Sequence, residues 1–271
     1  MPWIVPRRAL LVLASFVGAP LAAQTDYYNT DRGRPVQVED AYVAERHAFE
    51  LKLAPVRLER SRGGVYTWGV EPEIAYGVLP RTQVEVGLPL SYRDEGGNSR
   101  SGVAGLELSV MHNLNAETEG VPALAIRADL LAPVGNLAPT RAYPSITAIG
   151  TRTYRWARIH LNATYTAGSA PAATTTTEGA RGAELSRWLV GGAIDRTYPL
   201  RSTLVTAEFY GRKPLIANEA VVYNTGVGTR HQLTPTLAID GGLGRRLNGD
   251  DRGWYVTFGT AYAFGLFASG R

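Results

Sequence analysis

The sequence contains no cysteine, and this absence excludes several classes of exported protein. A small secreted domain held together by disulfides is excluded, and so is a lipoprotein anchored through a lipidated cysteine. Thiolate ligands for a zinc site are missing, and the four histidines include no pair at helical or finger spacing. We therefore predict neither a metal site nor a cofactor.

The chain also lacks an excess of charge of one sign. Its formal net charge is +4, from 28 basic and 24 acidic residues. Arg7 and Arg8 lie in an expected leader, so 26 basic residues (28 minus 2) remain in the mature chain against 24 acidic ones. No stripe of lysine and arginine stands out along the sequence, so we expect no nucleic-acid partner.

Long hydrophobic runs are absent after residue 23, where none approaches the roughly 20 residues that a transmembrane helix needs. At the N-terminus, Arg7 and Arg8 precede the short apolar run 9–17 and then the small residues 18–23, which is the order of a secretory signal peptide. A membrane-spanning helix is the competing interpretation, but Gly18 and Pro20 interrupt the run. We predict a signal peptide at residues 1–23, so any crossing by the mature chain must use strands.

What the chain does contain is alternation with a period of two, the pattern of β-strands with two unlike faces. Residues 254–266 alternate bulky apolar side chains with small or polar ones, and residues 66–78 and 84–92 read as a hairpin with a polar face. Residues 48–60 alternate as well, with a change of phase at Pro55 that predicts a bulge. Continuing along the chain, we expect about twelve such strands, since a tilted spanning strand needs about 9 to 11 residues.

The connections between these strands alternate between short and long. Residues 79–82, 115–120, 153–157, 196–201 and 231–236 are short connections, whereas 93–103, 133–145, 167–184 and 211–220 are longer. Short periplasmic turns and long external loops are typical of a transmembrane β-barrel, whereas a soluble sandwich, the competing interpretation, has no reason to sort loops in this way. In lipid, only helices and closed barrels satisfy every backbone polar group.

We therefore predict an all-β fold, an antiparallel transmembrane β-barrel of about twelve strands at residues 45–271 in the bacterial outer membrane. The last strand should pair with the first and remove the sheet edge. Residues 24–44 form a predicted periplasmic N-terminal segment. For that segment we favour a solvated leader over a plug or a periplasmic contact, because it is polar and lacks a sustained period.

One face of each strand should line the lumen, and that face carries most of the charge. Glu71, Glu73 and Glu85 form a local cluster of one sign, which makes them our first candidates for a selectivity site. Two interpretations stay open: a wet channel, or a lumen closed by ion pairs. The full set of candidate lumen-lining residues is Glu50, Lys52, Glu71, Glu73, Glu85, Glu107, Arg127, Asp129, Arg187, Asp195, Glu208, Arg230, Asp240 and Arg246.

Four stretches of the chain resemble one family of bacterial outer-membrane proteins, which is named for the MetA pathway of phenol degradation and often labelled as a transporter. The similar residues are 66–76, 81–89, 102–108 and 123–135. The chain differs from the family pattern at Gly105 and Val134, and it continues past Phe267 to Arg271. The resemblance implies a barrel of about twelve strands that passes small solutes, including aromatic or hydrophobic ones.

We predict that the protein is not an enzyme but a passive channel for small solutes, with outer-membrane lipid around it; the sequence leaves its oligomeric state open. One alternative is a non-conducting barrel that supports the envelope or binds a partner through loops 133–145 and 167–184. A weaker alternative is a membrane lipid hydrolase that uses His112. Ser109 lies on the opposite face of the same predicted strand, which argues against a serine–histidine pair there.

Overall fold

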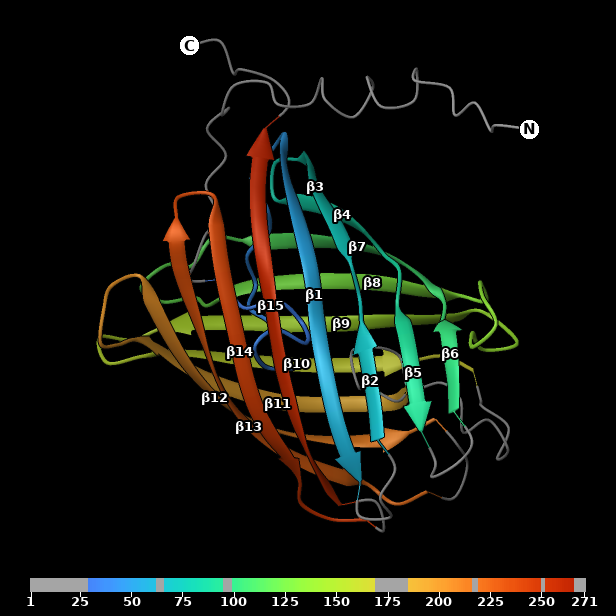
Figure 1. The fold of residues 1–271 in the computed structure, drawn as a ribbon. Coiled ribbons are helices and arrows are strands. Elements are labelled where there is room, and N and C mark those ends of the chain that lie inside the picture. The colour runs from blue at the N-terminus through green and yellow to red at the C-terminus, as the bar shows by residue number, and fades with distance from the viewer. Residues whose placement is uncertain are drawn as a thin grey trace, which may run out of the picture.

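The computed structural model describes residues 29–61, 66–94, 99–168, 185–215, 219–249 and 252–265. They form an antiparallel β-sheet that is closed into a barrel by pairing of its first and last strands (Figure 1). Across these ranges, no helix has both the length and the apolar character needed to cross a membrane. The predicted signal peptide, residues 1–23, lies outside the described residues and stays a prediction.

The sheet contains fifteen strand segments. In three cases, β2 with β3, β4 with β5 and β6 with β7, two consecutive segments form one interrupted strand that crosses the membrane. The barrel wall therefore consists of twelve strands, and the predicted fold class is confirmed. The segments are β1 (Ala48–Ser61), β2 (Tyr66–Val70), β3 (Glu73–Leu79), β4 (Thr82–Gly87), β5 (Leu90–Asp94), β6 (Ser99–Val103), β7 (Leu106–Asn115), β8 (Ala123–Ala132), β9 (Tyr143–Thr153), β10 (Arg158–Thr166), β11 (Ser186–Thr197), β12 (Thr203–Pro214), β13 (Val222–Thr234), β14 (Leu237–Arg246) and β15 (Gly253–Gly265).

The barrel closes where β1 runs beside β15, with Ala48 opposite Gly265 and Ser61 opposite Gly253 (Figure 1). This is the pairing predicted from the two alternating segments, and it leaves no edge between the first and last strands. The register shifts between Leu53 and Val56, where the phase change at Pro55 predicted a bulge. The short turns lie at the end where β1 begins and β15 ends, which makes this the periplasmic end of the barrel.

Three adjacent crossings are interrupted at neighbouring positions, which the sequence pattern did not predict. Residues 66–78 and 84–92 were expected to be continuous strands, but each is divided, at Pro72 and Pro89 respectively. Proline has no backbone N–H to donate to the ladder, so the local pairing changes there. The backbone N–H of Leu88 donates to the carbonyl of Pro72 (3.0 Å), and that of Ala104 to the carbonyl of Pro89 (2.8 Å).

A further difference concerns the long connection expected at residues 93–103. Ser99–Val103 form β6, which pairs with β5 from Leu90 opposite Val103 to Asp94 opposite Ser99. Glycine and serine made this stretch look like a loop, but the β5–β6 ladder supplies hydrogen bonds that override weak local propensity. The external connection is therefore shorter than predicted.

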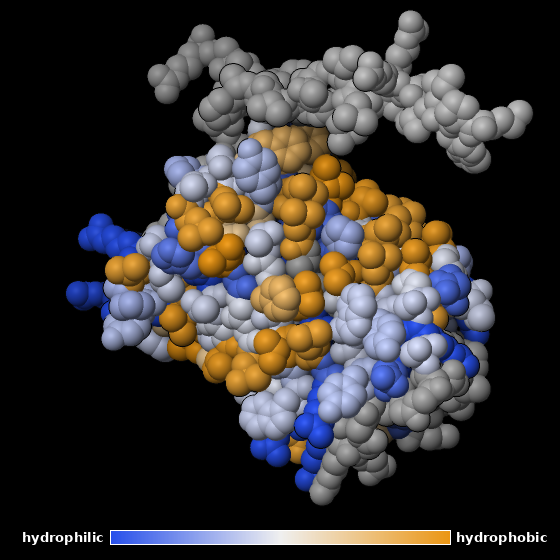
Figure 2. Space-filling view, in the orientation of Figure 1, coloured by the Kyte–Doolittle hydropathy of each residue, from blue (hydrophilic) through white to orange (hydrophobic). Residues whose placement is uncertain are grey.

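Apolar side chains cover the outer surface of the barrel, and Figure 2 shows them gathered over much of one face, with hydrophilic residues toward one end. Leu161, for example, has 63% of its surface exposed, a fraction that suits lipid rather than water. The aromatic residues Trp254 and Tyr262 are exposed near opposite ends of β15, as expected for side chains at the two membrane interfaces. The outer surface is therefore a lipid-facing belt.

Candidate functional site

The N-terminal segment lies inside the barrel, and we call residues 29–44 the plug segment. Figure 1 shows its blue trace running within the ring of strands. Arg34 is 1% exposed and Val38 and Ala41 are fully buried, although the segment belongs to no strand. The expectation of a solvated leader is therefore wrong for the described part of residues 24–44. The segment is polar because it packs against a polar lumen, not because it faces water.

The plug segment enters and leaves the lumen at the same end of the barrel. Its two limbs meet where the backbone N–H of Asp40 donates to the carbonyl of Thr30 (3.1 Å) and that of Thr30 donates to Asp40 Oδ2 (2.9 Å). After the second limb, His47 N–H donates to the carbonyl of Gly77 at the periplasmic end of β3 (2.7 Å), and β1 follows directly. The plug segment is thus a loop inserted from the periplasmic side.

The tip of this loop is held by side chains of the barrel wall. Glu208 Oε2 accepts hydrogen bonds from the backbone N–H groups of Gln37 (2.7 Å) and Val38 (3.0 Å). Thr257 Oγ1 donates to the carbonyl of Pro35 (2.9 Å). A buried backbone group without a partner is costly, so an irregular segment can lie in a lumen only if the wall supplies partners of this kind.

The returning limb is held in the same way by uncharged polar side chains. Asn162 both accepts from the N–H of Glu39 and donates to its carbonyl, each at 2.8 Å. Thr151 Oγ1 accepts from the N–H of Ala41 (2.9 Å), and Asn113 Nδ2 donates to the carbonyl of Ala41 (2.7 Å). These three wall residues were not among the predicted lumen-lining residues, because only charged side chains were considered as candidates. Their inward positions in the alternation were the available signal.

Asp31 of the plug segment joins three basic side chains. Its carboxylate lies 2.9 Å from Lys52 Nζ, 2.8 Å from Arg230 Nη1 and 2.5 Å from Arg34 Nη2. Arg34 also reaches Asp240 across the lumen, with 3.4 Å between Nη1 and Oδ2. The loop is therefore tied to strands β1, β13 and β14, which lie far from it in the sequence.

A second group of ion pairs surrounds Arg127 on β8. Its guanidinium lies 2.5 Å from Glu85, 2.7 Å from Asp129 and 3.3 Å from Glu39 of the plug segment. Arg32 of the plug segment pairs with Asp129 at 3.0 Å and also with Glu107. Buried ion pairs of this kind add little net stability, but they fix geometry and make loss of one partner costly.

These pairs correct one prediction, that Glu71, Glu73 and Glu85 form a cluster of a single sign. Lys52 Nζ lies 2.6 Å from Glu85 and 3.8 Å from Glu73, and Arg127 also contacts Glu85. The reason is the strand order, because β1 pairs with β3 and places Lys52 directly opposite Glu73. Glu71 lies at the β2–β3 break and is buried. The site is therefore a mixed ion-pair network.

The structure places the other candidate residues at several levels of the barrel. Asp195 accepts from Arg158 Nη2 (2.8 Å) and lies 2.9 Å from Nε2 of buried His160. Arg187 lies at the register shift between Ser186 and Trp188, which interrupts the alternation that assigned it to the lumen. The buried candidates are Lys52, Glu71, Glu73, Glu85, Arg127, Asp129, Asp195, Glu208, Arg230, Asp240 and Arg246. Their role in solute passage stays a prediction.

The carboxyl group of Asp40 in the plug segment has a raised pKa. Burial raises the pKa of this carboxyl group to about 6. Arg158, His160 and the hydrogen bonds donated by the backbone N–H groups of Thr30 and Tyr42 act in the opposite direction and lower this pKa. A raised pKa means that the docked loop favours the protonated form. The protonated carboxyl group of Asp40 thus stabilises the docked loop. This stabilisation is present in full below a pH of about 3.8, the pKa of the group in the unfolded chain, and it is lost as the pH rises through about 6.

Two glycines of the wall allow the plug segment to approach closely. A Cβ atom at Gly228 would lie 2.6 Å from Cβ of Pro35, and one at Gly242 would lie 2.3 Å from the Pro35 carbonyl oxygen. We expect Gly228→Val to displace the tip of the loop and to increase the open time of single channels in planar bilayers several-fold. Gly150→Val is the matched control, because its Cβ would meet only Leu124 at 3.6 Å. Equal open times in the two variants would show that the tip does not occlude the lumen.

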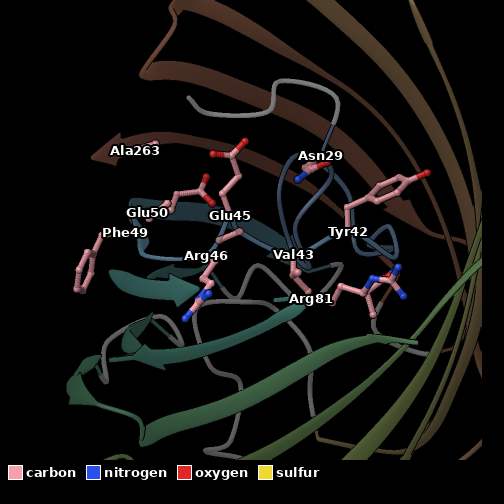
Figure 3. Close-up of a pocket in the computed structure, with 12 residues that line it drawn as sticks. Asn29, Tyr42, Val43, Glu45, Arg46, Phe49, Glu50, Arg81 and Ala263 are labelled. Atoms are coloured by element: carbon pink, nitrogen blue, oxygen red, sulfur yellow. The ribbon is translucent and has the colours of Figure 1, made fainter. Parts of the chain in front are cut away.

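A cavity of about 340 Å³ lies at the periplasmic end, between the plug segment and the barrel wall. Figure 3 shows the charged side chains of Glu45, Arg46, Glu50 and Arg81 around it, with Asn29 and Tyr42 of the plug segment at one side. Its volume is within the range of small-ligand sites, and its lining is mixed in charge. The cavity is therefore a periplasmic vestibule next to the point where the plug segment leaves the lumen.

No family model matches the chain, and no curated protein matches it. Among solved structures, the chain is similar to the COG4313 outer membrane channel from Pseudomonas putida F1, with a TM-score of 0.55, 14% identity and coverage of 83% of this chain and 98% of that one. It is also similar to KdgM porin, with a TM-score of 0.48, 11% identity and coverage of 80% and 99%. Outer membrane phospholipase A from Escherichia coli has a TM-score of 0.41, 10% identity and coverage of 88% and 100%.

The first of these similarities supports the same fold, and the closed barrel with its apolar belt defines the chain as a bacterial outer-membrane β-barrel. The finer resemblance to the MetA-pathway family stays a prediction, since no family model matches.

The serine–histidine pair that the weaker alternative, a lipid hydrolase, would need does not form around His112 in the described residues. The Nδ1 atom of His112 lies 2.9 Å from Thr82 Oγ1 on the outer face, and Ser109 Oγ accepts from Arg127 on the inner face (2.8 Å). The two side chains therefore lie on opposite sides of β7, as the alternation predicted. Among the described residues, no group of three or more histidine and carboxylate side chains is arranged to hold a metal ion.

Proposed function

We propose that the protein is an outer-membrane channel for passive passage of small solutes, in which the plug segment closes the lumen and opens it by withdrawing toward the periplasm. The observation that carries this proposal is a buried polar loop with both limbs at the periplasmic end of the barrel. Because neither limb is threaded through to the external side, the loop can leave without any strand separating.

The chemistry of the contact supports withdrawal. The loop is bound mainly by hydrogen bonds and ion pairs, which water can replace. Within the described ranges, the buried apolar cluster that it joins is small: Ala41 with Met111, Ala123, Ala125 and Ile149, and with Tyr42 and Val43 packed against it. Polar contacts are typical of interfaces that separate and re-form, whereas permanent interfaces are more hydrophobic. A twelve-stranded barrel also lies between eight-stranded barrels filled by their side chains and the 16-stranded porins.

Small solutes are the substrate class that this arrangement fits. The vestibule of about 340 Å³ next to the plug segment has room for a small organic molecule. The resemblance of residues 66–76 and 123–135 to the MetA-pathway family adds aromatic or hydrophobic solutes as a finer proposal. The alternative is a permanently closed barrel that supports the envelope or binds a partner, and it is favoured by the large number of contacts to the plug segment.

A disulfide across the plug segment tests the proposal, and the absence of native cysteine gives a clean background. Ala41 and Ala125 belong to one buried cluster, and Asn113, which donates to the carbonyl of Ala41, is directly opposite Ala125 in the sheet. The double variant Ala41→Cys with Ala125→Cys therefore puts one thiol on the plug segment and one on the wall in the same cluster. We expect no single-channel current from the oxidised protein and a current like that of the unmodified protein after reduction. The measurement is planar-bilayer recording, with thiol titration to show that the bridge forms.

The two single-cysteine variants are the controls, and neither should respond to oxidant. A reduced, correctly folded protein that carries neither current nor solute into liposomes would contradict the channel and favour the closed barrel. Correct folding is checked by heat-modifiable migration on gels. A current that persists in the oxidised protein would instead show that the pore does not run past Ala41.

A further inference from the structure

Four side chains form a row across the outer surface of the barrel near its external end. We call Arg245 on β14, Trp254 on β15, Arg60 on β1 and Tyr66 on β2 the interface row. Trp254 is directly opposite Arg245 on one side and Arg60 on the other. Arg60 is also directly opposite Tyr66. Figure 1 shows these four strands side by side where the barrel closes, so the row joins the two ends of the chain.

The interface row lies at the external border of the lipid-facing belt. All four of its side chains are exposed, whereas the adjacent residues Arg246 and Tyr255 face the lumen and are buried. Two residues closer to the membrane centre, the same strands carry exposed apolar side chains: Leu243, Val256, Leu58 and Trp68. Figure 2 shows hydrophilic residues beyond the apolar ones at this end of the strands. Arginine and aromatic side chains at such a border lie at the level of the lipid head groups.

Each arginine of the row lies over an aromatic ring of the next strand. The guanidinium carbon of Arg245 is 5.0 Å from the centre of the Trp254 ring, and that of Arg60 is 5.5 Å from the centre of the Tyr66 ring. A guanidinium group over a ring uses its flat surface for this contact, while its N–H groups lie in its own plane. The rings therefore position the two arginines and leave their donors directed sideways, in the fork that binds a phosphate through two hydrogen bonds.

The two arginines are spaced for a head group with two phosphates. Strand β15 alone separates β14 from β1, and neighbouring strands lie about 4.8 Å apart, so the two backbones are about 10 Å apart. Trp254 lies between the arginines and offers a ring against which a sugar can pack. Beyond Tyr66 the row continues with Asp94 on β5, so its basic part is confined to β14, β15 and β1.

From this arrangement we infer that the interface row binds lipid A, the part of lipopolysaccharide that carries a phosphate at each end of a two-sugar head group. Arg245 and Arg60 each bind one phosphate, and the acyl chains cover the apolar side chains beneath the row. Lipid A belongs to the outer leaflet, which surrounds this end of the barrel. Binding needs two guanidinium groups at the level of the head groups rather than an excess of positive charge over the external end. The site uses only the outer surface, so the inference does not rest on the proposed channel.

Native mass spectrometry of the purified full-length protein in detergent measures the binding of single lipid molecules. We expect lipid A with two phosphates to bind at least about tenfold more tightly than its monophosphorylated form or phosphatidylglycerol, because hydrogen bonds between charged groups are the stronger ones. The double variant Arg60→Gln with Arg245→Gln should bind lipid A at least about tenfold more weakly than the unmodified protein.

Arg155→Gln with Arg196→Gln is the matched control, because it removes the same charge from exposed side chains at the periplasmic end of the barrel. It should change lipid A binding by less than about twofold. Equal losses in the two double variants would overturn the inference, and so would equal binding of lipid A and phosphatidylglycerol. The comparison of lipids uses the unmodified protein, so it is decisive even if heat-modifiable migration shows that a variant is not folded. If lipid A binds as expected but the protein carries no current, the lipid site stands and the channel is wrong.

Discussion

Deletion of the plug segment, residues 29–44, should raise the single-channel conductance of the barrel by at least about tenfold. The twelve strands would remain, because none of them contains a deleted residue and Glu45 to His47 still lead into β1. What disappears is the chain that fills the lumen between β4, β8, β10 and β12. A lumen of this strand number is wider than the side-chain-filled interior of an eight-stranded barrel. Planar-bilayer recording at fixed salt gives the conductance.

A second variant separates steric filling from specific docking. Replacing residues 30–41 with a glycine–serine sequence of equal length keeps the connection but removes the side-chain contacts and the ordered backbone contacts that these twelve residues make with the wall. We expect this chain to be open for most of the recording, with a conductance close to that of the deletion. If the deleted protein migrates as a folded barrel and its conductance equals that of the full-length protein, the plug segment does not close the pore.

Substitution of Arg127 by methionine should produce the largest loss of stability among single substitutions in the wall. Arg127 lies among Glu39, Glu85 and Asp129, so its removal leaves three carboxylates close together and buried. Breaking a buried ion pair costs about 3–5 kcal/mol, and water entering the lumen would bring the value toward the lower end. Urea denaturation in detergent, followed by heat-modifiable migration, measures the change.

Arg196→Met is the matched control for Arg127→Met, because Arg196 is exposed on the outer side of β11. It should change stability by less than about 1 kcal/mol, as exposed charges usually do. Glu85→Gln added to Arg127→Met should recover part of the lost stability by removing one of the repelling charges. Similar losses for Arg127→Met and Arg196→Met would show that water, rather than Arg127, solvates these carboxylates.

The amino-acid sequence by itself determined the architecture of this protein. Alternation with a period of two defines strands directly, because successive side chains point to opposite faces of a sheet. The same pattern in residues 48–60 and 254–266 predicted the closing pair β1–β15, and the phase change at Pro55 predicted the shift in register. Each strand has one apolar face, and short and long connections alternate along the chain. Together these two patterns predicted a β-barrel that spans a lipid membrane. These signals are local, so they can be read from one sequence.

Only the tertiary structure decided what lies inside the barrel. Asp31 meets Arg230, which is 199 residues away, and Gln37 meets Glu208, which is 171 residues away; no local pattern encodes such contacts. For this reason the plug segment was expected to be a solvated leader, and Glu73 and Glu85 were expected to form a site of one sign although Lys52 lies between them. Alternation specifies which side chains face the lumen, but their partners depend on strand order and on an irregular segment that follows no period.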